Sequence, residues 1–133
     1  MSMPPETHEK IAKLQKDVEE IRENQEDDWH ERREVYEQRV RRVLEGDRNC
    51  TVLYLEIDGI RSIKDIERDL ERQKRRIPQK TLWRAAARLL RGGLIRKTGT
   101  QGKSPIFSKK SWALTLDMDT YVRTKIQNQT ETS

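Results

Sequence analysis

The sequence predicts a mainly α-helical fold with one small β-hairpin, and three observations lead to this. Residues 6–45 contain neither proline nor glycine and are rich in strong helix formers. Residues 62–91 hold two amphipathic patterns separated by Ile77-Pro78 and ended by Gly92-Gly93. Residues 94–98 and 106–108 are short strand-like runs on either side of the glycine-rich stretch 99–105, which we expect to be a flexible loop.

The N-terminal third is expected to be a long helix over residues 6–45, after a disordered stretch at 1–5 that contains two prolines. A continuous helix of this length would span about 60 Å. Its apolar positions begin with the 3-4-3 spacing of a heptad seam, weaken at Gln25 and Asp28, and then resume. A second copy of the chain is the simplest partner, and the alternative is a helix packed back on its own domain. The predicted dimerisation residues are Ile11, Leu14, Val18, Ile21, Trp29 and Tyr36.

The remaining elements follow from local signals. Gly46 and its neighbours break the long helix, and Cys50–Asp58 is an apolar segment that could be a strand or a short buried helix. Ser62 is a good N-cap for a helix from Ile63, and Pro78 suits the first turn of a helix from about Gln79 to Arg91. The return strand could continue or resume through residues 112–116. A short helix is expected over 119–126, and a polar tail over 127–133.

The 133 residues carry a net charge of +5, which is unevenly distributed. Residues 1–46 have 9 Lys/Arg and 13 Asp/Glu, a net of −4, whereas residues 47–133 have 19 and 10, a net of +9. Residues 72–110 include 13 Lys/Arg and no acidic residue. Such a sustained positive field favours a polyanionic partner. The alternative is a solvated basic face that serves solubility, although mixed charge would do this better.

From Cys50 onward the predicted order is apolar segment, helix, turn, helix, strand, glycine-rich loop and strand. This order resembles the winged helix-turn-helix domain. The run Arg88-Leu-Leu-Arg-Gly-Gly-Leu-Ile-Arg96 is similar to the helix-to-wing junction of MarR- and PadR-type regulators. The resemblance covers roughly residues 50–116 within a domain expected at 50–126. Family members usually have a shorter connection than the one here between the two central helices.

The resemblance implies that the second helix enters the DNA major groove and that the hairpin is the wing. In that helix the apolar residues share one arc and the cations share the opposite stripe. The predicted recognition-helix residues are Gln79, Lys80, Thr81, Arg84, Arg88 and Arg91. The residues expected to hold phosphates before it are Lys74, Arg75 and Arg76. The wing residues are Arg96, Lys97, Thr100, Gln101 and Lys103. The alternatives are a solvated helix face and a plain hairpin turn.

Other chemistry is not indicated. The two histidines are 22 residues apart and make no metal-ligand spacing with Cys50, the single cysteine. No nucleophile arrangement and no phosphate-cradling glycine motif occurs, so we expect no enzyme activity, no cofactor and no metal. Cys50 is expected to be a small buried core residue rather than a redox sensor. Without a long apolar run or a signal segment, we expect no membrane association and a cytoplasmic or nucleoid-associated protein.

These observations favour a sequence-specific double-stranded DNA-binding protein, a dimeric transcription regulator. Two alternatives remain open at this point. One is a winged-helix adaptor for protein interactions, and the other is a non-specific architectural or chromatin DNA-binding protein.

Overall fold

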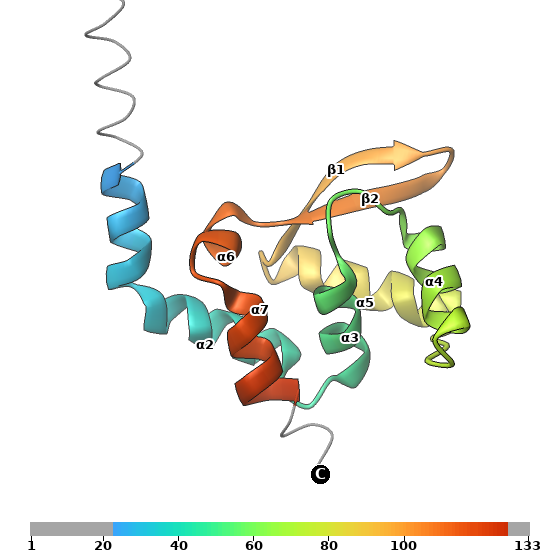
Figure 1. Ribbon diagram of the computed structural model, residues 1–133, viewed down its shortest axis with the longest axis horizontal. Coiled ribbons are helices and arrows are strands. Elements are labelled where there is room, and N and C mark those ends of the chain that lie inside the picture. Colours follow the sequence, from blue (N-terminus) through green and yellow to red (C-terminus); the bar gives the residue numbers. More distant parts are fainter. Residues whose placement is uncertain (1–22, 128–133) are drawn as a thin grey trace, which may run out of the picture. The chain divides into compact units, whose positions relative to one another are not determined.

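The computed structural model describes residues 23–127 (Figure 1). The chain divides between Arg33 and Glu34 into two units. In the first unit residues 23–31 are helical, and Arg32, in a turn, forms an ion pair of 3.5 Å with Asp28. The predicted seam residues Ile11, Leu14, Val18 and Ile21 lie outside the described residues, so the coiled coil stays a prediction.

The second unit contains most of the described residues and is mainly helical with one two-stranded antiparallel sheet. This confirms the predicted fold class at the level of helices plus a hairpin. Its elements in chain order are α2 (Arg33–Leu44), α3 (Arg48–Glu56), α4 (Ile63–Arg72), α5 (Gln79–Arg91), β1 (Ile95–Gln101), β2 (Ser104–Lys109), α6 (Ser111–Thr115), α7 (Met118–Tyr121) and a last π-helical segment, η1 (Val122–Gln127).

The long helix predicted over 6–45 is interrupted by the turn at Arg32. After this turn, α2 contributes Val40, Val43 and Leu44 to the core of the second unit. Tyr36 stacks on Trp112 of α6, with ring centroids 4.6 Å apart. Val43 lies so close to the end of α5 that a Cβ at Gly92 would come within 2.5 Å of its side chain. The apolar side of α2 is thus buried within its own domain. For α2 this agrees with the alternative to the coiled coil, a helix packed back on its own domain. The domain therefore begins before residue 50.

The ambiguous segment Cys50–Asp58 is helical through residue 56. Asp47 caps α3, because its carboxylate accepts a hydrogen bond of 3.0 Å from the Cys50 backbone N–H. Cys50 faces α5, where its thiol lies 3.8 Å from the Ala85 carbonyl. Burial, aided by Asp47, raises the pKa of the Cys50 thiol to about 12, so the reactive thiolate is strongly disfavoured. The prediction of a buried core cysteine is confirmed.

Helices α4 and α5 begin and end where the local signals place them. Ser62 and Asp65 form the capping box of α4. Helix α5 ends in a Schellman motif, in which Leu94 N–H bonds to the Leu89 carbonyl and Gly93, at φ +75°, occupies the left-handed position. Helix α4 ends in the same way, but its left-handed residue is Lys74, at φ 58°.

We expect Lys74→Gly to raise the free energy of unfolding by about 1 kcal/mol, because glycine avoids the cost that a side chain brings to the left-handed conformation. Lys74→Ala is the matched control, since it removes the same charge but keeps the strain, and it should bring no such gain. Urea unfolding of the two variants measures the difference. Equal stabilities would contradict the prediction.

The hairpin is longer and tighter than the sequence predicted. Residues 99–101 and 104–105 belong to the strands, and only Gly102 and Lys103 form the turn, so the expected flexible loop over 99–105 is wrong. Gly102 adopts φ +62°, as in two-residue hairpin turns with glycine at the first position. The register shifts between Lys97 and Gly99, where β1 has one residue, Thr98, without a paired residue on β2. A bridge between Ser62 and Ile106 adds a third short stretch at the edge of β2.

The chain after the hairpin covers the core with helices. The possible strand at 112–116 is wrong, because Ser111–Thr115 forms α6, whose Trp112 and Ala113 are buried. Helical structure at 119–126 is confirmed by α7 and η1. Lys109, at the end of β2, is buried and forms an ion pair of 2.7 Å with Asp119 of α7, which links the hairpin to this segment. Its ammonium also lies 5.0 Å from the centre of the Tyr54 ring on α3.

Candidate nucleic-acid interface

Helix α5 has two opposite faces. Its buried face packs on α3 and α4 and consists of Leu82, Ala85, Ala86 and Leu89. Lys80, Arg84 and Arg91 lie on the opposite side, where all three are exposed. None of them forms an ion pair with a residue of the described range 23–127. The helix therefore presents a row of uncompensated cations to its surroundings.

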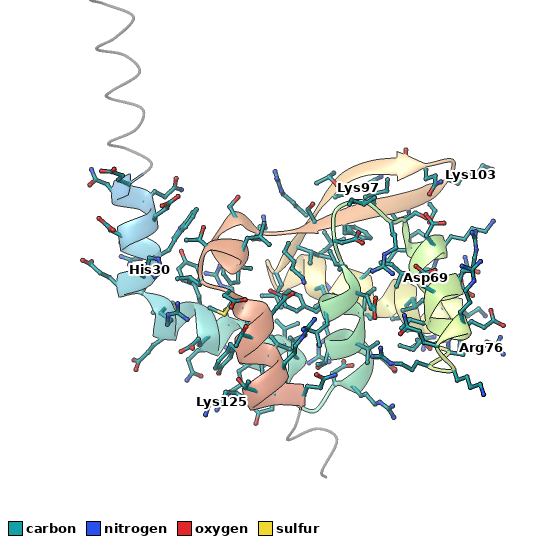
Figure 2. The ribbon with its side chains drawn as sticks, viewed as in Figure 1. His30, Asp69, Arg76, Lys97, Lys103 and Lys125 are labelled. Atoms are coloured by element: carbon teal, nitrogen blue, oxygen red, sulfur yellow. The ribbon has the colours of Figure 1, made fainter. Side chains whose placement is uncertain are left out.

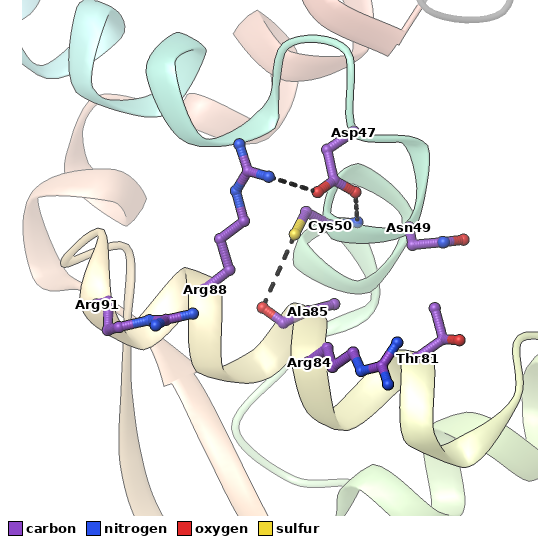
Figure 3. Close-up of a pocket in the computed structure, with 8 residues that line it drawn as sticks. All are labelled: Asp47, Asn49, Cys50, Thr81, Arg84, Ala85, Arg88 and Arg91. Carbon is purple, nitrogen blue, oxygen red and sulfur yellow. Dashed lines mark hydrogen bonds and ion pairs between the residues drawn. The ribbon is translucent and has the colours of Figure 1, made fainter.

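On the side toward α3, the row borders a concavity of about 320 Å³ (Figure 3). Arg88, unlike Lys80, Arg84 and Arg91, forms an ion pair: its guanidinium donates a hydrogen bond of 2.9 Å to Asp47. The same carboxylate caps α3 through Cys50. Arg88 thus joins α5 to the start of α3. Thr81 is half-buried on this side of the helix. The residues lining the concavity are Asp47, Asn49, Cys50, Thr81, Arg84, Ala85, Arg88 and Arg91.

A second concavity, of about 230 Å³, lies between the start of α3 and the connection from α4 to α5. Lys74, Arg75 and Arg76 line it, as the sequence suggested for an anion site, together with Arg48 and Asn49, which sequence reasoning missed. The missed signal was the position of these two residues directly after the cap of α3. Arg75 is partly neutralised by Glu56 at 3.5 Å, whereas Lys74 and Arg76 are exposed and form no ion pair within residues 23–127.

The hairpin flanks the other side of α5. Arg96, Lys97 and Thr100 are exposed on β1, and Lys103 occupies the turn, with Lys97 and Lys103 labelled along the hairpin in Figure 2. The backbone N–H of Lys64, in the first turn of α4, donates a hydrogen bond of 3.1 Å to the Ser104 hydroxyl. The turn of the hairpin is therefore tied to α4.

Next to this hydrogen bond, a third concavity of about 440 Å³ lies between α4, the first half of α5 and the hairpin turn. Gln79 faces this concavity, beside the exposed ring of Trp83. Gln101 and Lys103 line it from the hairpin. The predicted site residues therefore lie in five places: the outward row of α5, the side of α5 toward α3, the turn before α5, the exposed part of β1, and the concavity beside the hairpin turn.

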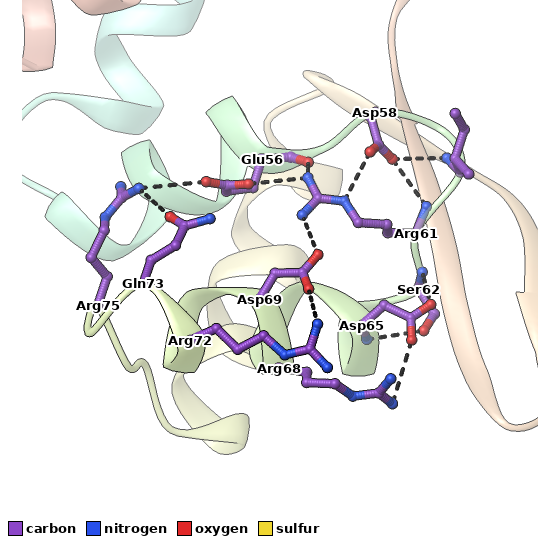
Figure 4. A network of polar contacts seen from close by, with 11 residues as sticks. Glu56, Asp58, Arg61, Ser62, Asp65, Arg68, Asp69, Arg72, Gln73 and Arg75 are labelled. Atoms are coloured by element: carbon purple, nitrogen blue, oxygen red, sulfur yellow. Dashed lines mark hydrogen bonds and ion pairs between the residues drawn. The ribbon is translucent and has the colours of Figure 1, made fainter.

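Four acidic side chains in and near α4 form local ion pairs (Figure 4). Arg61 lies at the centre of this network and contacts Glu56, Asp58 and Asp69, at 3.0, 2.8 and 2.9 Å. Arg68 and Arg72 add longer contacts to Asp65 and Asp69. These four carboxylates are paired with cations of their own region and not with the row on α5.

The contacts of Asp58 should make the stability of the domain depend on pH. Partial burial opposes the charged form of Asp58, but hydrogen bonds from the Arg61 and Ile60 backbone N–H groups and the Arg61 guanidinium outweigh it and lower the pKa of Asp58. A lowered folded pKa contributes stability above the ordinary aspartate pKa of about 3.9, and this stability is lost as the pH falls through the folded value. We expect Asp58→Asn to lower the free energy of unfolding at pH 7 and to match the wild type near pH 2. Urea unfolding across this range measures the gap, and a gap that does not change with pH would contradict the prediction.

Comparison with family models, with curated proteins and with solved structures finds no match for this chain. Within residues 23–127 no group of three or more His, Cys, Asp or Glu side chains is placed to hold a metal ion. In the same range no helix is both long and apolar enough to cross a membrane.

Proposed function

We propose that this chain binds double-stranded DNA through a winged helix-turn-helix domain and acts as a sequence-specific, dimeric transcription regulator. Helices α3, α4 and α5 are the three helices of that domain, and the β1–β2 hairpin is its wing. The observation that carries the proposal is the row of Lys80, Arg84 and Arg91, exposed opposite the buried face of α5 and unpaired within residues 23–127. An α-helix fits the major groove, and a cationic face is what the phosphates on either side of it favour.

The positions along α5 suggest different roles. In helix-turn-helix proteins the N-terminal half of the recognition helix contacts base edges. Lys80 and Arg84 lie in that half, and both residue types bind guanine through its O6 and N7 atoms. Arg91, in the last turn, is suited to a phosphate. Arg88 is held by Asp47, so we assign it to positioning α5 against α3 rather than to reading bases.

The flanking regions supply further phosphate contacts. Lys74 and Arg76 lie before α5, and Arg96, Lys97 and Lys103 lie on the hairpin, all exposed. If these five cations and Arg91 of α5 meet phosphates, about six contacts form, and duplex affinity should fall about a thousandfold between 50 and 200 mM salt. Fluorescence anisotropy of a labelled duplex across this range tests the proposal, and a flat salt response would contradict it.

Two single substitutions separate base recognition from phosphate contacts. We expect Arg84→Ala to cost about 1–3 kcal/mol on a preferred duplex and to flatten base preference at one position. Lys103→Ala should weaken all duplexes alike and reduce the salt slope by about one. The preferred duplex comes from selection out of a random pool at physiological salt. Recovery of no enriched sequence would favour the non-specific architectural function instead.

The dimer is proposed from the heptad seam of residues 11–21 alone. A chain shortened to begin at Gly46 would also lose Val40, Val43 and Leu44 from the core, so truncation is a poor test. Leu14→Ser with Val18→Ser in the full chain keeps that core. We expect sedimentation to show a dimer for the wild type and a monomer for this variant at micromolar concentration. A monomeric wild type would contradict the proposed dimer.

A further inference from the structure

We propose that the concavity between α4, α5 and the hairpin turn receives one unpaired nucleobase of a DNA strand whose duplex part lies on α5. The inference rests on the proposed function, because it takes α5 as the duplex-binding helix. It adds a preference for duplexes that contain an extruded or bulged nucleotide.

The first support is Trp83. This side chain is 41% exposed, although the chain has few aromatic residues and a small domain needs its large apolar side chains in the core. It lines the concavity from the first half of α5 and has no ring partner within residues 23–127. An exposed indole is a stacking platform for a base, and such platforms are how proteins hold unpaired nucleotides.

The second support is the set of polar groups around the ring. Gln79 and Gln101 approach the concavity from α5 and from β1, and neither side-chain amide makes a hydrogen bond within residues 23–127. An amide offers both a donor and an acceptor, which is what the edge of a base requires. Lys64 and Lys103 line the same concavity with exposed ammonium groups, which suit the phosphates of the extruded nucleotide.

The third support is that the walls are already in place. The hydrogen bond from Lys64 N–H to the Ser104 hydroxyl joins α4 to the hairpin, and the Ser62–Ile106 bridge joins the same elements again. The volume of about 440 Å³ falls within the range of sites that hold small organic ligands. A concavity that exists before binding costs less ordering than one that must form around its ligand.

An intact duplex cannot use these features fully. Each base within it is stacked on both faces, so only its edges are accessible and the ring of Trp83 has no base face to meet. A base that has left the stack presents its face and its pairing edge together. The concavity adjoins the half of α5 that carries Lys80 and Arg84, so an extruded base next to the groove would be within its reach.

The test compares three labelled DNAs with the full chain: a blunt duplex, the same duplex with one unpaired thymidine at its centre, and one strand alone. We expect the bulged duplex to bind about tenfold more tightly than the blunt one and to quench tryptophan fluorescence. Trp83→Ala should abolish the quenching and remove the preference, while binding to the blunt duplex stays unchanged. Trp83→Phe should keep part of the preference, because a phenyl ring still stacks.

Leu90→Ala is the matched control. Leu90 has the same exposed fraction of 41% on α5 but does not line the concavity, so the preference for the bulged duplex should survive its replacement. Circular dichroism checks that each variant is folded. Equal affinity for the bulged and blunt duplexes, without quenching, would overturn this inference and leave the proposed function standing. Failure to bind any of the three DNAs would overturn both.

Discussion

Replacing Lys80, Arg84 and Arg91 together by alanine is expected to weaken duplex binding about a hundredfold or more at physiological salt. All three side chains project from the exposed face of α5 and form no ion pair within residues 23–127. Each lost phosphate contact reduces the salt slope by about 0.9, and a lost base contact costs about 1–3 kcal/mol. Anisotropy titrations at several salt concentrations should therefore show a slope smaller by about one, from the lost phosphate contact of Arg91. The two lost base contacts should lower the affinity at every salt concentration.

The matched control for this variant is Arg42→Ala with Arg123→Ala and Lys125→Ala. It removes the same number of positive charges from exposed positions on α2 and η1 of the same unit. If net charge alone attracted DNA, the two triple variants would bind equally weakly. We expect the control to stay within a few-fold of the wild type. If the α5 variant is folded and retains full affinity, α5 does not enter the groove, and the protein-interaction adaptor becomes the better function.

Leu89→Asp is expected to unfold the second unit. Leu89 is fully buried, at 0% exposure, on the face of α5 that packs against the other helices. A carboxylate placed there has no partner, and its desolvation costs several kcal/mol in addition to the lost apolar burial. Because small domains are stable by only about 5–15 kcal/mol, one such change suffices. Circular dichroism at 25 °C should show loss of most helical signal.

The neighbouring Leu90→Asp is the control. Leu90 is 41% exposed, so a carboxylate at that position remains in contact with water and the fold should persist. The pair makes the same chemical change one residue apart and tests the orientation of α5 directly. If both variants unfold, or neither does, the division of α5 into a buried and an exposed face is wrong.

The sequence by itself determined the elements whose signals are local. The N-cap at Ser62, the proline before α5 and the paired glycines after it placed α4 and α5 correctly, because caps and breakers act within one turn of a helix. The spacing of Leu82, Ala86 and Leu89 identified the buried face of α5 for the same reason. The acid-free stretch 72–110 needed no structure at all, since charge is a property of composition.

Tertiary structure decided whatever depends on partners distant in the chain. Cys50–Asp58 was ambiguous because a short apolar run suits a strand or a helix, and packing against α5 made it helical through residue 56. Residues 99–101 and 104–105 extend the strands because they pair across the hairpin and dock on α4. Tyr36 packs on Trp112, 76 positions away, and Arg88 bonds to Asp47, 41 positions away. Periodicity along the chain carries no information about contacts of that range, so only the folded arrangement distinguishes the free cations of α5 from the paired one and brings Trp83 beside the hairpin turn.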